Sequence, residues 1–209
     1  MSKYIYKFES FIKTSIKDMK NINIVEFGVK EGRSTRIFLE LCKKNSGKLY
    51  SIDIDNYEHK FKDSNWSFIQ SRDDNFEFLE KKLPTKIDVI YLDSLHEAEH
   101  VEKIFYHYYK KLNLNGFFFI DDISWLPYLE KETRDNFYCE INNKETFNKI
   151  LEIYKNNTEN FDLSFDFTSS GSCKIFKKTD SLNPPKKVKT RESGIKNYLR
   201  KFLRMINIK

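Results

Sequence analysis

Residues 24–34 read Ile-Val-Glu-Phe-Gly-Val-Lys-Glu-Gly-Arg-Ser, and the rest of the chain is interpreted from this segment. An apolar strand ends near Glu26, turns through Gly28 and Gly32, and leads into a helix with Ser34 in its first turn. Glycine lets the backbone approach a ligand closely, and a helix start presents free N–H groups to an anion. The pattern lacks the lysine of a phosphate-binding loop and the spacing of a dinucleotide fingerprint. It is compatible with a nucleoside site or with an ordinary strand-to-helix turn.

A second apolar run favours the nucleoside site. Residues 48–55 read Lys-Leu-Tyr-Ser-Ile-Asp-Ile-Asp, and Asp53 follows the glycine turn by about 20 residues. A carboxylate at this distance can accept hydrogen bonds from both hydroxyls of a ribose. The alternative is a solvated strand end, but together the two segments point to a nucleoside cofactor.

Two further strands, expected at 87–92 and 116–120, also lead into acids. Asp93 follows the first strand, and Asp121 and Asp122 follow the second. The helical stretch between them is long enough for the crossover that parallel strands require. Ligands of an open parallel sheet bind outside the carboxyl ends of its strands, so these acids should face one crevice with Glu26 and Asp53.

The carboxylates of Asp93, Asp121 and Asp122 would repel one another unless they are protonated or bridged by a cation. A set of oxygen ligands favours a hard divalent ion such as Mg²⁺ over Zn²⁺. The sequence therefore predicts a magnesium-type site beside the nucleoside pocket.

In these motifs the chain resembles the class I S-adenosylmethionine-dependent methyltransferases, and among them the small metal-dependent O-methyltransferases of the catechol and macrolide-sugar kind. The resemblance covers about residues 20–125. It rests on Glu26-x-Gly28-x-x-x-Gly32-x-Ser34, Asp53, Asp93-x-x-His96 and Asp121-Asp122. It implies an α/β fold with a doubly wound, mostly parallel, seven-stranded Rossmann-like sheet that ends in an antiparallel strand pair.

The resemblance also implies residue roles. The positions assigned to S-adenosylmethionine are Glu26, Gly28, Gly32, Ser34, Asp53, Ser71, Arg72 and Asp93, with Asp53 on the ribose and Ser71 and Arg72 along the adenine. Asp93, Asp121 and Asp122 are the expected metal ligands, and Asp93 and His96 the expected catalytic residues.

His96 departs from the catechol-type pattern, in which a lysine usually removes the acceptor's proton. Imidazole titrates near neutrality and can act as a general base without a large change of pKa. The alternative is a histidine that caps the following helix or ligates the metal. His100 and His107, further along the same helix, are interpreted as structural.

The remaining secondary structure follows from periodicity. We expect helices near 4–18, 33–44, 74–81, 96–112 and 146–154, and strands near 22–27, 48–53, 66–70, 87–92, 116–120, 161–167 and 173–177. Cys42, Cys139 and Cys173 show neither paired nor metal-ligand spacing, which suits a reducing cytosol. No signal peptide or membrane span is indicated.

The distribution of charge along the sequence predicts a catalytic domain, 1–180, followed by a basic tail, 181–209. The tail holds nine Lys/Arg against one Glu, a net of +8, so with the whole chain at +6 the domain carries −2. A helix over 194–209 places apolar residues at helical spacing among the cations. Such a helix can lie on an anionic membrane, contact a partner protein, bind RNA or fold back on the domain. We therefore expect a cytoplasmic protein, peripheral to a membrane if the tail binds one.

The resemblance also indicates the kind of acceptor. The resemblance favours a hydroxyl of a sugar, glycan or glycosylated metabolite, with a small-molecule phenol as the nearest alternative. An RNA methyltransferase should show a basic rim, and a non-catalytic partner protein should lose the strand-end acids. The aromatic segment 123–143, with Trp125 and Tyr128, is interpreted either as an acceptor-binding lid or as packing on the sheet.

Overall fold

In the computed structural model, residues 3–125, 138–187 and 194–205 are described. A single mixed sheet has the strand order β3-β2-β1-β4-β5-β7-β6. Its strands are β1 (Asn23–Phe27), β2 (Lys48–Asp53), β3 (Trp66–Gln70), β4 (Ile87–Leu92), β5 (Leu112–Asp121), β6 (Phe161–Asp166) and β7 (Ser172–Lys177). β1 to β5 run parallel to one another, and β7 is antiparallel to both β5 and β6. The predicted doubly wound sheet with its antiparallel pair is confirmed.

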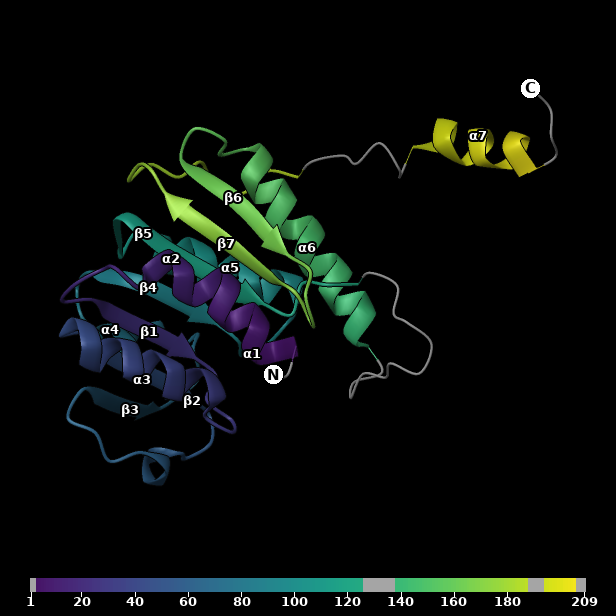
Figure 1. The fold of residues 1–209 in the computed structure, drawn as a ribbon. Coiled ribbons are helices and arrows are strands. Elements are labelled where there is room, and N and C mark those ends of the chain that lie inside the picture. Colours follow the sequence, from purple (N-terminus) through teal and green to yellow (C-terminus); the bar gives the residue numbers. More distant parts are fainter. Residues whose placement is uncertain (1–2, 126–137, 188–193, 206–209) are drawn as a thin grey trace.

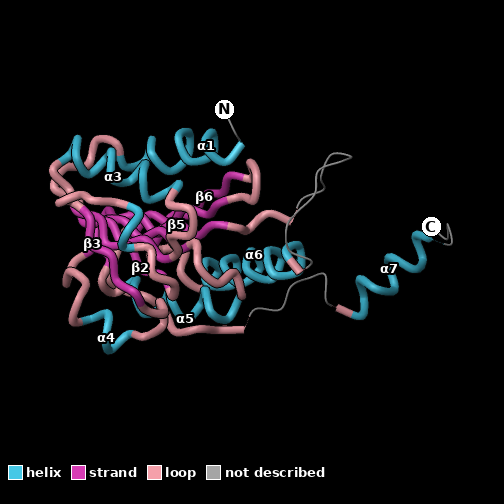
Figure 2. The backbone as a smooth tube through the Cα atoms, turned by 90° about the horizontal axis from the view of Figure 1, so that it is seen from below, coloured by secondary structure: helices cyan, strands magenta, loops and turns pink. Residues whose placement is uncertain are grey.

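Helices cover both faces of the sheet (Figure 1). On one face lie α3 (Arg33–Asn45) and an N-terminal segment made of α1 (Lys3–Lys7), a π-helical stretch (Phe8–Lys13) and α2 (Thr14–Ile16). On the other lie α4 (Phe76–Glu80), α5 (Ala98–Tyr109) and α6 (Cys139–Lys155). A one-turn 3-10 helix (Glu58–Lys60) precedes β3, and α7 (Ile195–Met205) lies in the tail. The view turned by 90° shows the same two layers around the sheet (Figure 2).

Apolar residues on alternate sides of the strands explain the two layers. Val25 and Phe27 of β1 belong to the core under α5 and α6, whereas Ile24 belongs to the core under α3 and the N-terminal segment. This alternation follows from the two-residue period of a strand, and both faces are buried because helices cover each of them.

The element boundaries differ most from the expectations at three places. α5 ends at Tyr109 and β5 already begins at Leu112, where the sequence predicted helix to 112 and strand from 116. The helix expected at 146–154 is α6, which begins at Cys139. The early start of β5 is supported by Lys177, whose buried ammonium donates to the carbonyls of Tyr109 at 2.9 Å and Leu112 at 2.7 Å.

The body of the molecule continues past residue 180. Leu182 packs against the core, and the amide N–H of Asn183 donates to the Asn157 side chain at 2.7 Å. The side chain of Asn156 donates to the Pro184 carbonyl at 2.8 Å. Residues 182–184, which were expected to belong to the tail, therefore lie against the end of α6.

Candidate active site

The glycine turn joins the ends of three strands. Gly28 has φ +96°, and a Cβ built on it would lie 2.1 Å from the backbone oxygen of Asp93. Its N–H donates to Ile52 of β2 at 2.9 Å, and the N–H of Asp93 donates to Phe27 at 2.8 Å. Gly32, with φ +75°, comes directly before α3. Only glycine fits at position 28, since both the left-handed backbone and the close approach of β4 exclude a side chain.

Glu26 lies beneath this turn and is completely buried. Its carboxylate accepts hydrogen bonds from Ser34 at 2.5 Å, Thr35 at 2.8 Å and Ser51 at 2.6 Å. Burial raises the pKa of Glu26 to about 7, although the three hydroxyls oppose the shift. Glu26 and the Ser34 hydroxyl, both expected to contact a cofactor, thus bond to each other and hold the start of α3 against β1 and β2.

Asp53 fastens the end of β2 to the same turn. Its Oδ2 accepts from the backbone N–H groups of Val29 at 2.7 Å and Lys30 at 3.2 Å, and its Oδ1 accepts from the N–H of Asp55 at 3.1 Å. The Asp53 side chain stays partly exposed at the strand ends.

Ser71 and Arg72 follow β3 at the same edge. The Ser71 N–H donates to the Asp53 carbonyl at 2.8 Å, which holds the segment against β2. The exposed Arg72 guanidinium forms an ion pair with Asp74 at 2.9 Å. Ser71 is thus bonded to Asp53 through the backbone, whereas the Arg72 side chain pairs with Asp74.

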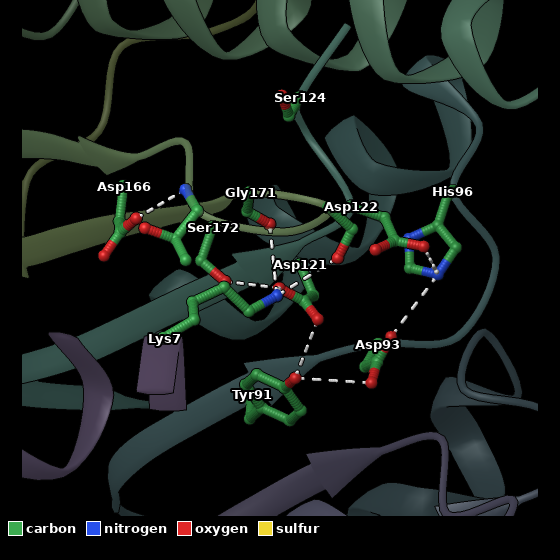
Figure 3. A network of polar contacts seen from close by, with 12 residues as sticks. Lys7, Tyr91, Asp93, His96, Asp121, Asp122, Ser124, Asp166, Gly171 and Ser172 are labelled. Atoms are coloured by element: carbon green, nitrogen blue, oxygen red, sulfur yellow. Dashed lines mark hydrogen bonds and ion pairs between the residues drawn. The ribbon is translucent and has the colours of Figure 1, made fainter. Parts of the chain in front are cut away.

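Asp93, His96 and Asp122 form a cluster just past the carboxyl ends of β4 and β5 (Figure 3). His96 Nε2 lies 3.4 Å from Asp93 Oδ1 and 3.5 Å from Asp122 Oδ2. One ligand atom from each residue falls within 4.8 Å of the other two. About a quarter of each side chain is exposed, so an ion or an acceptor can reach the group.

Asp121 faces away from this cluster, toward the N-terminal segment (Figure 3). Its Oδ1 accepts from the fully buried Lys7 ammonium at 2.5 Å and from the Ser172 hydroxyl. The Tyr91 hydroxyl donates to Asp121 Oδ2 at 3.0 Å and also lies 3.3 Å from Asp93 Oδ2. Asp121 was expected to be a metal ligand, but in the structure its carboxylate belongs to a buried ion pair.

Charge within the site follows from these contacts. Burial and the charge of Asp121 raise the pKa of Asp93 to about 6, against the effect of His96. Burial alone would lower the pKa of His96, but the hydrogen bond to Asp93 and the charge of Asp122 outweigh it and raise the pKa to about 9. For Asp121, the Lys7 ammonium outweighs burial and holds the pKa below its usual range. Two cations, Lys7 and protonated His96, therefore neutralise most of the charge of three carboxylates.

Lys7 and Tyr91 were not anticipated from the sequence. Lys7 shares one side of its helix with Tyr4, Phe8 and Phe11, and a lysine within an apolar stripe is the signal that could have identified it. Tyr4 also reaches the site, since burial and the nearby charges of Asp93 and Asp121 raise its pKa. The N-terminal segment thus contributes Lys7 to the carboxylate group at the strand ends.

His100 and His107 occupy packed positions. His100 Nε2 lies 2.8 Å from the carboxylate of Asp73, which also accepts from Ser94 at 2.5 Å. His107 stacks on Phe76 with the ring centroids 3.7 Å apart. Both contacts agree with the structural interpretation of these histidines.

Only part of the aromatic segment 123–143 lies within the described residues. Trp125 packs against Phe147 of α6, with the ring centroids 4.4 Å apart, and against Phe167 at 6.3 Å. For Trp125 the structure thus shows packing against α6 and the end of β6. Tyr128 and the rest of 126–137, on which the lid hypothesis depends, are outside the described residues.

Residues 25–123 match the sequence model of a family described as "Methyltransferase domain". Residues 25–123 thus have the sequence of a methyltransferase domain. The matched range begins in the strand before the glycine turn and ends just after Asp122, so it contains every strand-end acid discussed above. No curated protein sequence matches the chain.

Solved structures share the fold at low sequence identity. MycE methyltransferase from the mycinamycin biosynthetic pathway, in complex with Mg and S-adenosylhomocysteine, has a TM-score of 0.61 and 20% identity, covering 90% of this chain and 51% of MycE. A candidate caffeoyl-CoA O-methyltransferase from Staphylococcus aureus has a TM-score of 0.60 and 16% identity, covering 85% and 84%. A candidate rRNA methylase from Clostridium thermocellum has a TM-score of 0.60 and 13% identity, covering 85% and 98%.

The chain therefore spans about half the length of MycE. At these identities the structures establish a common fold, and the acceptors named in their descriptions belong to those proteins.

Proposed function

We propose that the methyltransferase transfers a methyl group from S-adenosylmethionine to a hydroxyl of a sugar, glycan or glycosylated metabolite, with the help of a divalent metal ion. The observation that carries the proposal is the position of Asp93. Its backbone packs on Gly28 of the cofactor turn, and its side chain belongs to the cluster with His96 and Asp122. Asp93 thus lies next to both the cofactor turn and the reactive groups. Methyl transfer requires its two ligands to be held side by side in this way.

The cofactor contacts are assigned to the exposed parts of the turn. The backbone of 28–32 and the start of α3 would hold the methionine end, Asp53 the ribose, and Ser71 and Arg72 the adenine. Glu26 and Ser34 would act from below by fixing the turn, because their polar atoms are already bonded to each other. The S-adenosylhomocysteine in MycE supports this choice of cofactor.

The donor set fits a divalent ion. Asp93 and Asp122 offer carboxylate oxygens and His96 an imidazole nitrogen, all within reach of one ion. Asp121 would support the site indirectly, because Lys7 occupies its carboxylate. When bound, the ion supplies Lewis-acid polarisation of an acceptor hydroxyl. Mg²⁺ is the proposed ion, with the Mg-containing MycE complex in support.

His96 can act as a general base or as a metal ligand, but not as both at once, because both roles use Nε2. As a general base, it would take the acceptor's proton on Nε2. As a ligand, it would donate the same nitrogen's lone pair to the metal. The base role is our proposal, and it requires the pKa of about 9 to fall, which a cation shared by Asp93 and Asp122 would bring about by offsetting their charge.

The resemblance favours a sugar hydroxyl, and two observations support a small-molecule acceptor over RNA. A MycE structure with Mg and S-adenosylhomocysteine also contains mycinamycin VI, a small-molecule ligand. The body of the chain carries a net charge of −2, which does not suit a polyanionic RNA substrate. A phenolic hydroxyl remains the alternative acceptor, in line with the Staphylococcus aureus neighbour.

The cofactor proposal is tested by calorimetric titration with S-adenosylmethionine and S-adenosylhomocysteine. We expect wild-type binding, and Asp53→Ala should weaken it by about tenfold or more because a charge-assisted pair of hydrogen bonds is lost. Asp55→Ala is the matched control, since Asp55 is an exposed neighbour with no assigned contact to the cofactor. Absence of binding by the wild type would contradict the proposal and favour a non-catalytic role for the fold.

The metal and base roles are separated by a second set of titrations with Mg²⁺ and Mn²⁺. Asp122→Asn should weaken ion binding, whereas His96→Ala should keep the ion and lose turnover if His96 is the base. A loss of ion affinity in His96→Ala equal to that in Asp122→Asn would instead make His96 a ligand. Turnover that is indifferent to a chelator would contradict metal assistance. Deoxysugars and glycans are the first acceptors to screen, followed by phenols.

A further inference from the structure

α7 exposes an apolar surface that the described residues do not cover. Its exposed fractions are 81% for Ile195, 74% for Tyr198, 56% for Leu199, 60% for Phe202 and 42% for Leu203. In Figures 1 and 2, α7 stands apart from the sheet and its helices. Large apolar side chains are rarely left in water together, so a surface of this kind marks an interaction site.

Polar and apolar residues are separated around the helix. At about 100° per residue, the five apolar side chains fall within an arc of about 140°. Lys196, Arg200 and Arg204 lie outside this arc and are exposed. The segment Ile195–Met205 contains four Lys/Arg and no acidic residue. The helix thus presents one apolar face and one polar face that carries the cations and Asn197 and no acid.

We propose that α7 binds the surface of an anionic lipid membrane, with its apolar face among the acyl chains and its cations on the lipid phosphates. Charge complementarity carries the choice of occupant, because a cationic face without acids beside an apolar face matches the anionic plane and the acyl layer of a lipid surface. Tyr198, at the edge of the apolar arc, has the ring and hydroxyl suited to the headgroup boundary. RNA would use the cations and leave the exposed apolar face unexplained.

The connection to the body is long enough for this arrangement. The last described contacts of the body are those of Asn183 and Pro184 with α6. Nine residues, 186–194, separate the Pro184-Pro185 pair from α7 and can span at most about 30 Å. They include Lys186, Lys187, Lys189 and Arg191, which add to the attraction toward an anionic surface. The catalytic body would thus be held near a membrane. Described residues contain no helix both long and apolar enough to cross it.

The test is co-sedimentation of the full chain with vesicles of phosphatidylcholine alone or mixed with phosphatidylserine. We expect binding to the mixed vesicles that is at least about tenfold stronger than to the neutral ones and that weakens with salt. Equal binding to both vesicle types, or none to either, would overturn the proposal. Tight binding to a structured RNA together with no vesicle binding would reassign α7 to nucleic acid.

Two double variants distinguish membrane binding by the apolar face of α7 from nonspecific binding through exposed leucines elsewhere. Leu199→Ser with Phe202→Ser should abolish vesicle binding while the net charge stays the same. The matched control is Leu114→Ser with Leu151→Ser, which changes two leucines on the body that are 51% and 38% exposed and should bind as the wild type. Equal losses in both pairs would contradict a specific role for α7.

Amide hydrogen exchange supplies a second readout. The α7 amides should exchange fast in solution and become protected with anionic vesicles, because an isolated short helix is only marginally stable in water. Strong protection without vesicles would show that the helix already folds against protein, and would overturn the membrane proposal.

Discussion

At the scale of single residues, the carboxyl groups of the site differ in their tendency to ionise because their neighbours differ. Asp121 is held ionised by Lys7, whereas burial and like charge raise the pKa of Asp93 to about 6. Among the described residues no cation pairs with Glu26, which depends on three hydroxyl donors. Each environment predicts a different response to substitution.

Lys7→Met should strongly destabilise the protein, because it leaves the carboxylate of Asp121 buried without a partner. A loss of about 3–5 kcal/mol in the free energy of unfolding is expected. Lys7→Met combined with Asp121→Asn should recover much of this loss. Urea denaturation of the three proteins measures the effect.

Lys13→Met is the control for Lys7→Met, since Lys13 lies in the same N-terminal segment and pairs with Glu9 at 2.8 Å while about a third of its side chain is exposed. Its cost should stay below about 1 kcal/mol. Similar losses in Lys7→Met and Lys13→Met would mean that the buried pair has no special role.

Glu26→Gln should change how stability depends on pH. In the folded protein the pKa of Glu26 is raised from 4.5 to about 7, so folding favours its protonated form. The stability that this provides is present below pH 4.5 and is lost as the pH rises through 7. Relative to the wild type, Glu26→Gln should therefore gain about 3 kcal/mol between acidic and mildly alkaline pH. Parallel stability curves, measured by denaturation across this range, would contradict the buried Glu26 network.

At the scale of elements, the strand-to-helix turn does more than bring β1 to α3. It packs against the end of β4 through Gly28 and is held to β2 by Asp53. The carboxyl ends of three parallel strands are therefore fixed relative to one another by one turn, which is the condition for a shared crevice.

Gly28→Ala should disrupt that arrangement. The new Cβ would meet the Asp93 backbone at 2.1 Å, so either the turn or the end of β4 must move. We expect S-adenosylhomocysteine affinity to fall by about tenfold or more because a shift of this size misplaces the site.

Lys30→Gly is the control within the same turn. Lys30 also has a positive φ, 45°, but it is exposed, so glycine removes strain without a clash. The control should bind the cofactor as the wild type, and an equal loss in both variants would point to flexibility of the turn instead. Calorimetric titration distinguishes the two results.

At the scale of the whole molecule, the end of the folded body decides where the tail begins. A chain ending at residue 185 keeps the contacts of Leu182, Asn183 and Pro184 with the body and should unfold at the wild-type temperature. A chain ending at residue 180 loses these hydrogen bonds and the packing of Leu182, at a cost of about 2 kcal/mol. Thermal unfolding of the two truncated proteins compares them directly, and equal stabilities would place the boundary at 180 instead.

Local sequence patterns were enough to predict the order of strands and helices along the chain, the glycine turn and the acids at the strand ends. Strand periodicity and glycine spacing are local properties, so each could be recognised without knowledge of the rest of the chain. The chemistry of a parallel sheet then placed those acids at one edge, and the seven-stranded sheet of the structure agrees.

Tertiary structure alone decided how each acid is used. Lys7 and Asp121 are 114 positions apart, and nothing in either local segment specifies their pairing. The position of Asp121 away from the cluster, the burial of Glu26 under its hydroxyl donors and the packing of 182–184 on α6 likewise arise from contacts between distant segments. The ionisation state and accessibility of a group depend on its three-dimensional surroundings, which is why residue type and spacing could locate the site but could not assign every carboxylate within it.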